Sequence, residues 1–294
     1  MEKKHSLKPI KGRRLKSGDW IVVAKESDAL IVNEELAKSL IHNNSLDCYD
    51  IETVHLLQEN GFYIDENDKI ESFPDEKNNI RWNIKRMTLF ILGGLSILIS
   101  LVLSLFKGIP SGSVLINSRI PLPANLIYLI AFSLITTLIH ELMHIIFSRS
   151  YFFRTGGLRL NFVQAKATVS MTHIWVWSFL SRLAALSAGL AFDSFLLATL
   201  LILDYFVIDW KVSAAISILW LRIIWQFRFH KNCDGYFIVS ALFDNPILGI
   251  DSNESSKEIK ISRVLKIIGY AVNLLIIVYW VIPFLWILFS SIFL

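Results

Sequence analysis

Long apolar runs dominate the last two-thirds of the chain, whereas the first third alternates between apolar and polar positions. Each run is about as long as a helix must be to cross the hydrocarbon core of a bilayer. Pro283 lies inside the last run and predicts a kink there. The pattern predicts about five transmembrane helices, near residues 88–106, 125–148, 182–204, 212–229 and 266–293.

The first third predicts a small soluble domain over residues 17–73. Strands are expected at 20–24, 29–32 and 62–64. Asn33 and Asp50 are typical helix N-caps, and Gly61 is a typical stop for the second helix. This order of elements suits a winged-helix-like module, which could bind a peptide at a strand edge or serve only as a structural cap.

Residues 151–172, between the second and third runs, do not continue a helical pattern. Leu158, Leu160 and Phe162 alternate with polar residues, and residues 165–169 could pair with them. We expect a short β-hairpin at the membrane surface, whose edge could hold an extended substrate. The alternative is a simple amphipathic connector.

The expected fold class is an all-α polytopic membrane protein with a small α+β winged-helix-like N-terminal cytoplasmic domain and this hairpin. The predicted organisation is a basic flexible tail (1–16), the small domain (17–73), a linker (74–86), a membrane core (87–250), and a cytoplasmic loop with a C-terminal transmembrane helix (251–294).

Composition agrees with a membrane protein, because 54% of the residues are hydrophobic and 18% are charged. Lys and Arg cluster before the first run, after the second and fourth, and before the last. These clusters fall on one side if the N-terminus is cytoplasmic, so the net charge of +4 indicates topology and not nucleic-acid binding. Cys48 and Cys233 form no disulfide framework. We expect a bacterial cell-membrane protein, since Ile, Asn, Lys and Ser are abundant.

The second apolar run contains His140-Glu141-Leu142-Met143-His144, an H-E-x-x-H motif. Residues four apart share one helix face, so both imidazoles can reach one metal ion while Glu141 exchanges a proton with a water beside it. Ionisable residues inside a membrane helix indicate function by default. The alternative is a pair of histidines that hydrogen-bond to neighbouring helices.

A catalytic zinc site needs a third protein ligand from the same side and a similar depth. Asp234 meets both conditions, although it could also be an ordinary turn aspartate. His230, His173 and Asp193 are competitors, while Asp204 lies at the outer end of its run. Asp193 is more consistent with a role in supporting a ligand or orienting substrate than with direct ligation.

These residues resemble the site-two proteases, a family of intramembrane zinc metalloproteases. The resemblance rests on the H-E-x-x-H helix, the pair Ala188-Gly189, and Asp234-Gly235 on the same side. The run Asp234–Pro246 is similar to D-G-Y-x-x-x-S-x-L-x-x-x-P of the peptide zinc metalloproteases found beside bacterial peptide-export and bacteriocin gene sets. The resemblance covers about residues 85–250.

The resemblance implies zinc held by His140, His144 and Asp234, with Glu141 as general base and acid. Asp193 and Asn232 are expected to support a ligand or orient the substrate. The implied reaction is hydrolysis of a peptide or single-span membrane protein near the cytoplasmic face by zinc-activated water. Peptide-export or peptide-modifying proteins are the implied partners, besides the lipid bilayer; iron or cobalt would suit the same ligands.

This chain departs from the family pattern at three places. Met143 stands where Gly is usual, Leu190 where Pro is usual, and the Asn-Pro run before the second motif is missing. A non-proteolytic membrane partner that binds peptide in an export or immunity system is therefore the alternative function. A transporter with a proton relay is a third, although the sequence has no internal repeat of the kind many transporters show.

Overall fold

The computed structural model shows a mostly helical chain that divides into two compact units. The first unit comprises Met1–Trp82, His144–Ala185 and Ala241–Pro246, and the second comprises Asn83–Met143, Leu186–Ser240 and Ile247–Leu294. The structure describes residues 7–42, 49–64, 74–150, 158–161, 166–169, 171–229, 233–246, 248 and 256–293.

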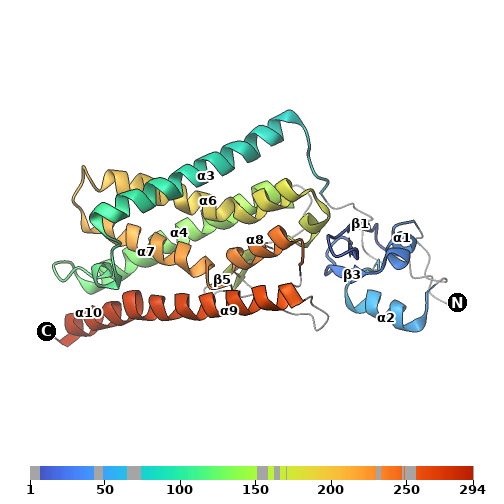
Figure 1. Cartoon of the computed structure of the whole chain (residues 1–294). Coiled ribbons are helices and arrows are strands. Elements are labelled where there is room, and N and C mark those ends of the chain that lie inside the picture. Colours follow the sequence, from blue (N-terminus) through green and yellow to red (C-terminus); the bar gives the residue numbers. More distant parts are fainter. Residues whose placement is uncertain are drawn as a thin grey trace. The chain divides into compact units, whose positions relative to one another are not determined.

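The N-terminal part of the first unit is a three-stranded antiparallel sheet with two helices (Figure 1). Its elements are β1 (Lys11–Arg14), β2 (Trp20–Val23), β3 (Leu30–Val32), α1 (Glu34–His42) and α2 (Ile51–Glu59). Strand β2 lies in the middle, so its apolar side chains are covered and Val22 joins Leu40, Leu57 and Phe62 in a buried core. Burial of these side chains supplies the driving force for this part to fold.

The predicted helix starts and stop are confirmed. Asn33 Oδ1 accepts a hydrogen bond from Leu36 N at 2.8 Å, and Asp50 Oδ1 accepts one from Thr53 N at 2.9 Å. These carboxylate and amide oxygens satisfy N–H groups that the first helical turn leaves unpaired. Gly61 ends α2 with a φ of +78°, a conformation that costs glycine little.

The prediction of a flexible tail over residues 1–16 is wrong at residues 11–14, which form β1. This strand pairs with β2, and the apolar residues on either side of it, Ile10 and Leu15, are buried. The strand was not predicted because three of its four residues are Lys or Arg. Charged side chains are nevertheless common in a strand at a sheet edge, which is where β1 lies.

Two neighbouring predictions also need correction. Residues 62–64 form no strand, because only an isolated bridge joins Tyr63 to Leu7. The predicted linker 74–86 is shorter than expected, since helix α3 (Ile80–Lys107) already begins at Ile80. Residues 80–86 of the predicted linker therefore form the polar first turns of α3, and the apolar part of this helix follows them.

Four helices in the described part of the chain are long and apolar enough to cross a membrane. They are α3, α4 (Leu122–Ser148), α6 (Phe179–Leu203) and the last helix, Ile259–Ile292. Only 11% of the most apolar stretch of α4 is buried, so its side chains would face water in a soluble protein. The coarse prediction of several membrane-length helices is therefore confirmed.

The fourth of the five predicted spans, 212–229, is not among these helices. Helix α7 (Trp210–Gln226) has 17 residues, about 25 Å of helix, and includes Lys211 and Arg222. A turn after Gln226 separates it from a short apolar helix, α8 (Asp234–Phe243). The apolar run in the sequence continues past Gln226, so the predicted C-terminal end of this helix was too late.

The long helices of the second unit run beside one another (Figure 1). Helices α6 and α7 bury a shared core that includes Leu197, Leu201, Ile216 and Leu219. Gly93 of α3 faces Ala191 of α6, where an added Cβ would lie 2.9 Å from the alanine Cβ. Small residues thus let these helices approach closely, as is common among membrane helices.

Near Pro283, where the sequence predicts a kink, the helix contains a π-helical turn. Helix α9 (Ser256–Ile276) continues through η3 (Ile277–Val281) into α10 (Ile282–Phe293). Ile282 N–H donates to Ile277 O, five residues earlier, as in a π-helix. Proline has no N–H to donate, so a changed hydrogen-bond pattern beside it has a physical cause.

The predicted hairpin is present as β4 (Leu158–Asn161) and β5 (Lys166–Val169), which pair antiparallel. Phe162, which the alternation also included, lies outside the described residues. The short helix η2 (Thr172–Val176) follows and leads into α6.

A buried ion cluster in the first unit joins β1 to the residue after α8. Asp244 accepts hydrogen bonds from Arg13 at 2.9 and 2.7 Å and from Arg182 at 2.6 Å. Asp244 is 5% exposed and Arg182 is 3% exposed. Burial alone would raise the pKa of Asp244, but the hydrogen bonds from Arg13 and Arg182 outweigh it, so the pKa lies below its ordinary value.

Asp244→Ala is expected to destabilise the protein by about 3 kcal/mol, because the buried Arg182 and the half-buried Arg13 lose their shared carboxylate. Asp204→Ala is the control, since Asp204 forms a more exposed pair with Lys107 that is worth less than about 1 kcal/mol. Thermal unfolding in detergent measures both. Equal losses in the two variants would contradict the buried-cluster argument.

The lowered pKa of Asp244 also gives the parent a pH dependence. Its contribution to stability is present above the unfolded-state pKa, near pH ~4, and is lost as the pH falls through the lower folded-state pKa. We expect the parent to melt at lower temperature below about pH 4, with a weaker dependence in Asp244→Ala.

Candidate metal centre

Helix α4 places His140 and His144 on one face, one turn apart. Both are buried, with 4% and 2% of their surfaces exposed. Glu141 follows His140 on the same helix and is half-buried. A buried imidazole needs a hydrogen-bond partner, so the neighbours of each ring nitrogen define what the histidines can do.

Both rings have their Nδ1 atoms bound to acceptors. His140 Nδ1 lies 2.9 Å from Asp193 Oδ2, and His144 Nδ1 lies 2.7 Å from the carbonyl oxygen of Ala185. A carbonyl oxygen and a carboxylate can only accept, so each Nδ1 carries the hydrogen. A neutral ring then has its lone pair on Nε2, which is the form of histidine that binds a metal.

Asp234, the first residue of α8, brings its carboxylate to this face. Asp234 Oδ2 lies 3.0 Å from His140 Nε2. One ligand atom from each of His140, His144 and Asp234 lies within 4.8 Å of the other two. At this distance either a proton on Nε2 or a bound metal cation must lie between the ring nitrogen and the carboxylate oxygen. Two imidazole nitrogens and a carboxylate oxygen therefore fit a divalent transition metal such as zinc.

Gln226, the last residue of α7, positions Asp234. The backbone N–H of Asp234 donates to Gln226 Oε1 at 2.9 Å. Gly235 is required beside it, because an added Cβ would lie 2.2 Å from Gln226 O. The chain interrupts the helix between Gln226 and Asp234 although the Asn-Pro run is missing. Asn232 and His230, both considered from the sequence, lie outside the described residues.

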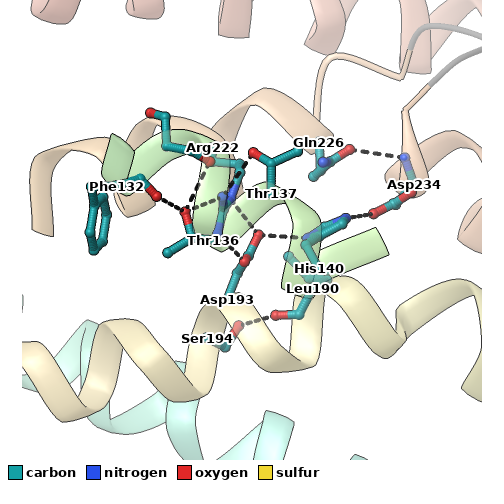
Figure 2. Close-up of polar contacts among 11 residues, drawn as sticks. Phe132, Thr136, Thr137, His140, Leu190, Asp193, Ser194, Arg222, Gln226 and Asp234 are labelled. Carbon is teal, nitrogen blue, oxygen red and sulfur yellow. Dashed lines mark hydrogen bonds and ion pairs between the residues drawn. The ribbon is translucent and has the colours of Figure 1, made fainter. Parts of the chain in front are cut away.

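Asp193, on α6, accepts a hydrogen bond from Nδ1 of His140 and is itself bound by Arg222 of α7 (Figure 2). Arg222 Nε donates to Asp193 Oδ2 at 2.8 Å, and Arg222 Nη2 donates to the other carboxylate oxygen. Arg222 Nη1 donates to Thr136 Oγ1 at 2.8 Å and to Thr137 Oγ1 at 3.3 Å. The carboxylate is fully buried and pairs with the guanidinium.

Gly189 of α6 lies directly against the ring of His140. A Cβ added at Gly189 would lie 2.4 Å from His140 Nε2 and 2.6 Å from two ring carbons. No real Cβ approaches an atom so closely, so only glycine leaves room for the imidazole here. This contact gives a physical reason for the Ala-Gly pair noted in the sequence.

The competitor His173 and the set-aside Asp204 both have other partners. His173 is buried, and its Nε2 donates to Ser148 O at 2.8 Å. Burial lowers the pKa of His173 to about 4, so the ring is neutral at pH 7. Asp204 pairs with Lys107 Nζ at 2.7 Å. Neither residue belongs to the metal group found among the described residues.

Sequence reasoning brought His140, His144 and Asp234 together but missed Arg222 and Gln226. A signal for Arg222 existed, because a cation inside an apolar run needs a buried partner and Asp193 is a mid-helix carboxylate. Gln226 had no such signal, since a glutamine at the end of a helix is ordinary.

Comparison of the chain with protein-family models, with curated proteins and with solved structures found no match in any of the three. The resemblance to the site-two proteases therefore rests on the motif residues of this chain. Its function must be argued from the site.

Proposed function

We propose that the chain is a multi-pass membrane zinc metalloprotease that hydrolyses a peptide or a membrane-anchored substrate. One observation carries the proposal: both Nδ1 atoms of the H-E-x-x-H histidines are bound to acceptors, while Asp234 faces Nε2 of His140 at 3.0 Å. Such an arrangement prepares three ligands for one ion before it arrives.

Four apolar helices of membrane length support placement in a bilayer. The Lys and Arg clusters favour a cytoplasmic N-terminus, because cytoplasmic loops carry the excess of positive charge. His140 and His144 would then lie toward the cytoplasmic end of α4. The small N-terminal domain, winged-helix-like by its element order, would lie in the cytoplasm and present a peptide-binding strand edge.

The proposed roles follow from the contacts of each residue. Nε2 of His140, Nε2 of His144 and a carboxylate oxygen of Asp234 would hold the ion. Asp193 and the Ala185 carbonyl keep the protons on the two Nδ1 atoms, which fixes the orientation of both rings. Zinc, when bound, supplies a Lewis acid that polarises a carbonyl and acidifies water. Glu141 would accept the proton of the attacking water and pass it to the leaving amide nitrogen.

The substrate must present an extended backbone, since a helix hides its carbonyl groups in intrahelical hydrogen bonds. A Gly, Pro or polar residue near the cut would ease local unwinding of a membrane-anchored substrate. The β4–β5 hairpin offers strand edges to which an extended peptide could pair. Equal cleavage of stable helical spans that lack such residues would count against this preference.

The first test is the metal content of the detergent-purified protein. We expect about one zinc per chain, lost or weakened in His144→Ala and in Asp234→Ala, because each removes one ligand of the proposed three. Elemental analysis of the parent and both variants measures this. A folded parent that binds no added zinc would sink the proposal and favour the non-proteolytic peptide-binding partner.

Glu141→Gln separates a protease from a metal-binding partner. The amide cannot accept the proton, so cleavage of single-span peptides in proteoliposomes should fall by at least ~100-fold. Zinc content should stay at the parental level, because Glu141 is not among the three proposed ligands. Cleavage at the parental rate by this variant would exclude the proposed role of Glu141.

A further inference from the structure

A second polar site lies in the second unit, in a cavity of about 300 Å³. Its walls come from the residues just after α7, from α8, from Leu248 beyond α8, and from α9. Arg228 and Lys266 contribute positive charge, Ser262 and Asn273 contribute neutral polar groups, and aromatic rings complete the wall. No acidic side chain lines this cavity among the residues that the structure describes.

Arg228 is fixed by its neighbours, but its buried Nε–H group has no hydrogen-bond acceptor among the described residues. Gly269 of α9 lies so close that an added Cβ would be 2.3 Å from Arg228 O. The guanidinium stacks over the ring of Trp225, 3.9 Å from its centroid. Its Nε is buried and has no hydrogen-bond partner in the described structure. None of the described residues supplies an acceptor for this buried donor, so it can still bind an anionic oxygen.

Lys266 lies on α9 and has no acidic partner among the described residues. Two cations with no acidic partner in the described part of the chain therefore face one small cavity, together with hydroxyl and amide donors. Arginine binds phosphate oxygens through a planar fork of N–H groups, and lysine adds a point charge. The chemistry of the cavity thus suits a phosphate group.

We propose that this cavity binds the phosphate group of an anionic phospholipid. The outer face of α9 around it is apolar and exposed, at Ile267, Ile268 and Leu274, which is where acyl chains would lie. Trp225 and Tyr270 are also exposed, as aromatic residues at the headgroup level of a membrane are. Basic pockets between membrane helices bind anionic headgroups. This proposal rests on membrane placement and not on the metal or on proteolysis.

Native mass spectrometry of the full-length protein in detergent tests the proposal, with added phosphatidylglycerol or phosphatidylcholine. We expect retention of phosphatidylglycerol over phosphatidylcholine. Lys266→Gln should weaken phosphatidylglycerol binding about fivefold, and Arg228→Gln with Lys266→Gln about twenty-five-fold. Lys260→Gln and Arg263→Gln, singly and together, are the matched controls, since they remove the same charges from α9 outside the cavity. The controls should bind as the parent does.

Equal losses in Lys266→Gln and Lys260→Gln would overturn the proposal, because surface charge alone would then explain binding. Equal retention of both lipids by the parent would also overturn it. Inorganic phosphate that displaces the lipid at equal concentration would assign the cavity to a soluble anion instead. Lys266 is exposed, so its variant should fold even if Arg228→Gln does not. Zinc content should stay parental in every variant, which separates this test from that of the metal site.

Discussion

Gly189→Ala is expected to abolish stable metal binding, although it adds only one methyl group. The new Cβ would lie 2.4 Å from His140 Nε2, so the ring must leave its position or the helices must part. Overpacking of this kind costs about 1–3 kcal/mol of stability. Loss of the ligand orientation should lower metal affinity by at least about 100-fold. Metal content and a zinc titration of the purified variant measure the effect.

Gly94→Ala is the control for this substitution. Gly94 is also a helical glycine, in α3, but nothing lies within 4 Å of its added Cβ. Alanine favours a helix over glycine by about 1 kcal/mol, so this variant should be as stable as the parent or more stable. Parental zinc affinity in Gly189→Ala would show that His140 does not hold the ion in the arrangement described.

The second large effect is expected on breaking the pair of Arg222 and Asp193. Arg222→Met leaves a fully buried carboxylate with His140 as its remaining partner, which should cost about 3–5 kcal/mol. The carboxylate would no longer be fixed, so metal affinity should fall by about 10–100-fold. Thermal unfolding and a zinc titration measure the two effects separately.

The double variant Arg222→Met with Asp193→Asn tests whether the two residues act as a unit. Removal of both charges should recover most of the stability but not the metal affinity, because His140 still lacks its carboxylate support. Arg119→Met removes an exposed arginine and should change stability by about 0.5 kcal/mol or less. Additive losses in the double variant would show that the residues do not interact.

Local sequence patterns predicted the features of the fold and of the site that depend on a single helix. The four-residue spacing of His140 and His144 predicts a shared face on any α-helix, and the helix caps at Asn33 and Asp50 follow from side-chain chemistry alone. Asp234 was chosen by its depth and side in the membrane. The structure brings it to the same face as the histidines.

The contacts between helices could not be predicted from the sequence pattern. The fit of Gly189 against His140, and the hydrogen bond from Asp234 to Gln226, depend on how α4, α6, α7 and α8 pack. Strand β1 was hidden by its charges, because an edge strand can keep lysine and arginine in solvent. The predicted span 212–229 extends past Gln226, where α7 ends, because hydrophobicity alone does not mark the end of a helix.

The π-turn at Ile277–Val281 has a consequence for the phase of the last helix. It acts as a one-residue insertion, and one residue corresponds to about 100° of rotation in an α-helix. Trp280 occupies the inserted turn, is buried, and donates its indole N–H to Ser217 Oγ at 3.1 Å. An added Cβ at Gly112 would clash with its carbonyl oxygen, so this turn is held from two sides. The faces of α9 and α10 are thereby set out of phase, and each half of the helix can meet different neighbours.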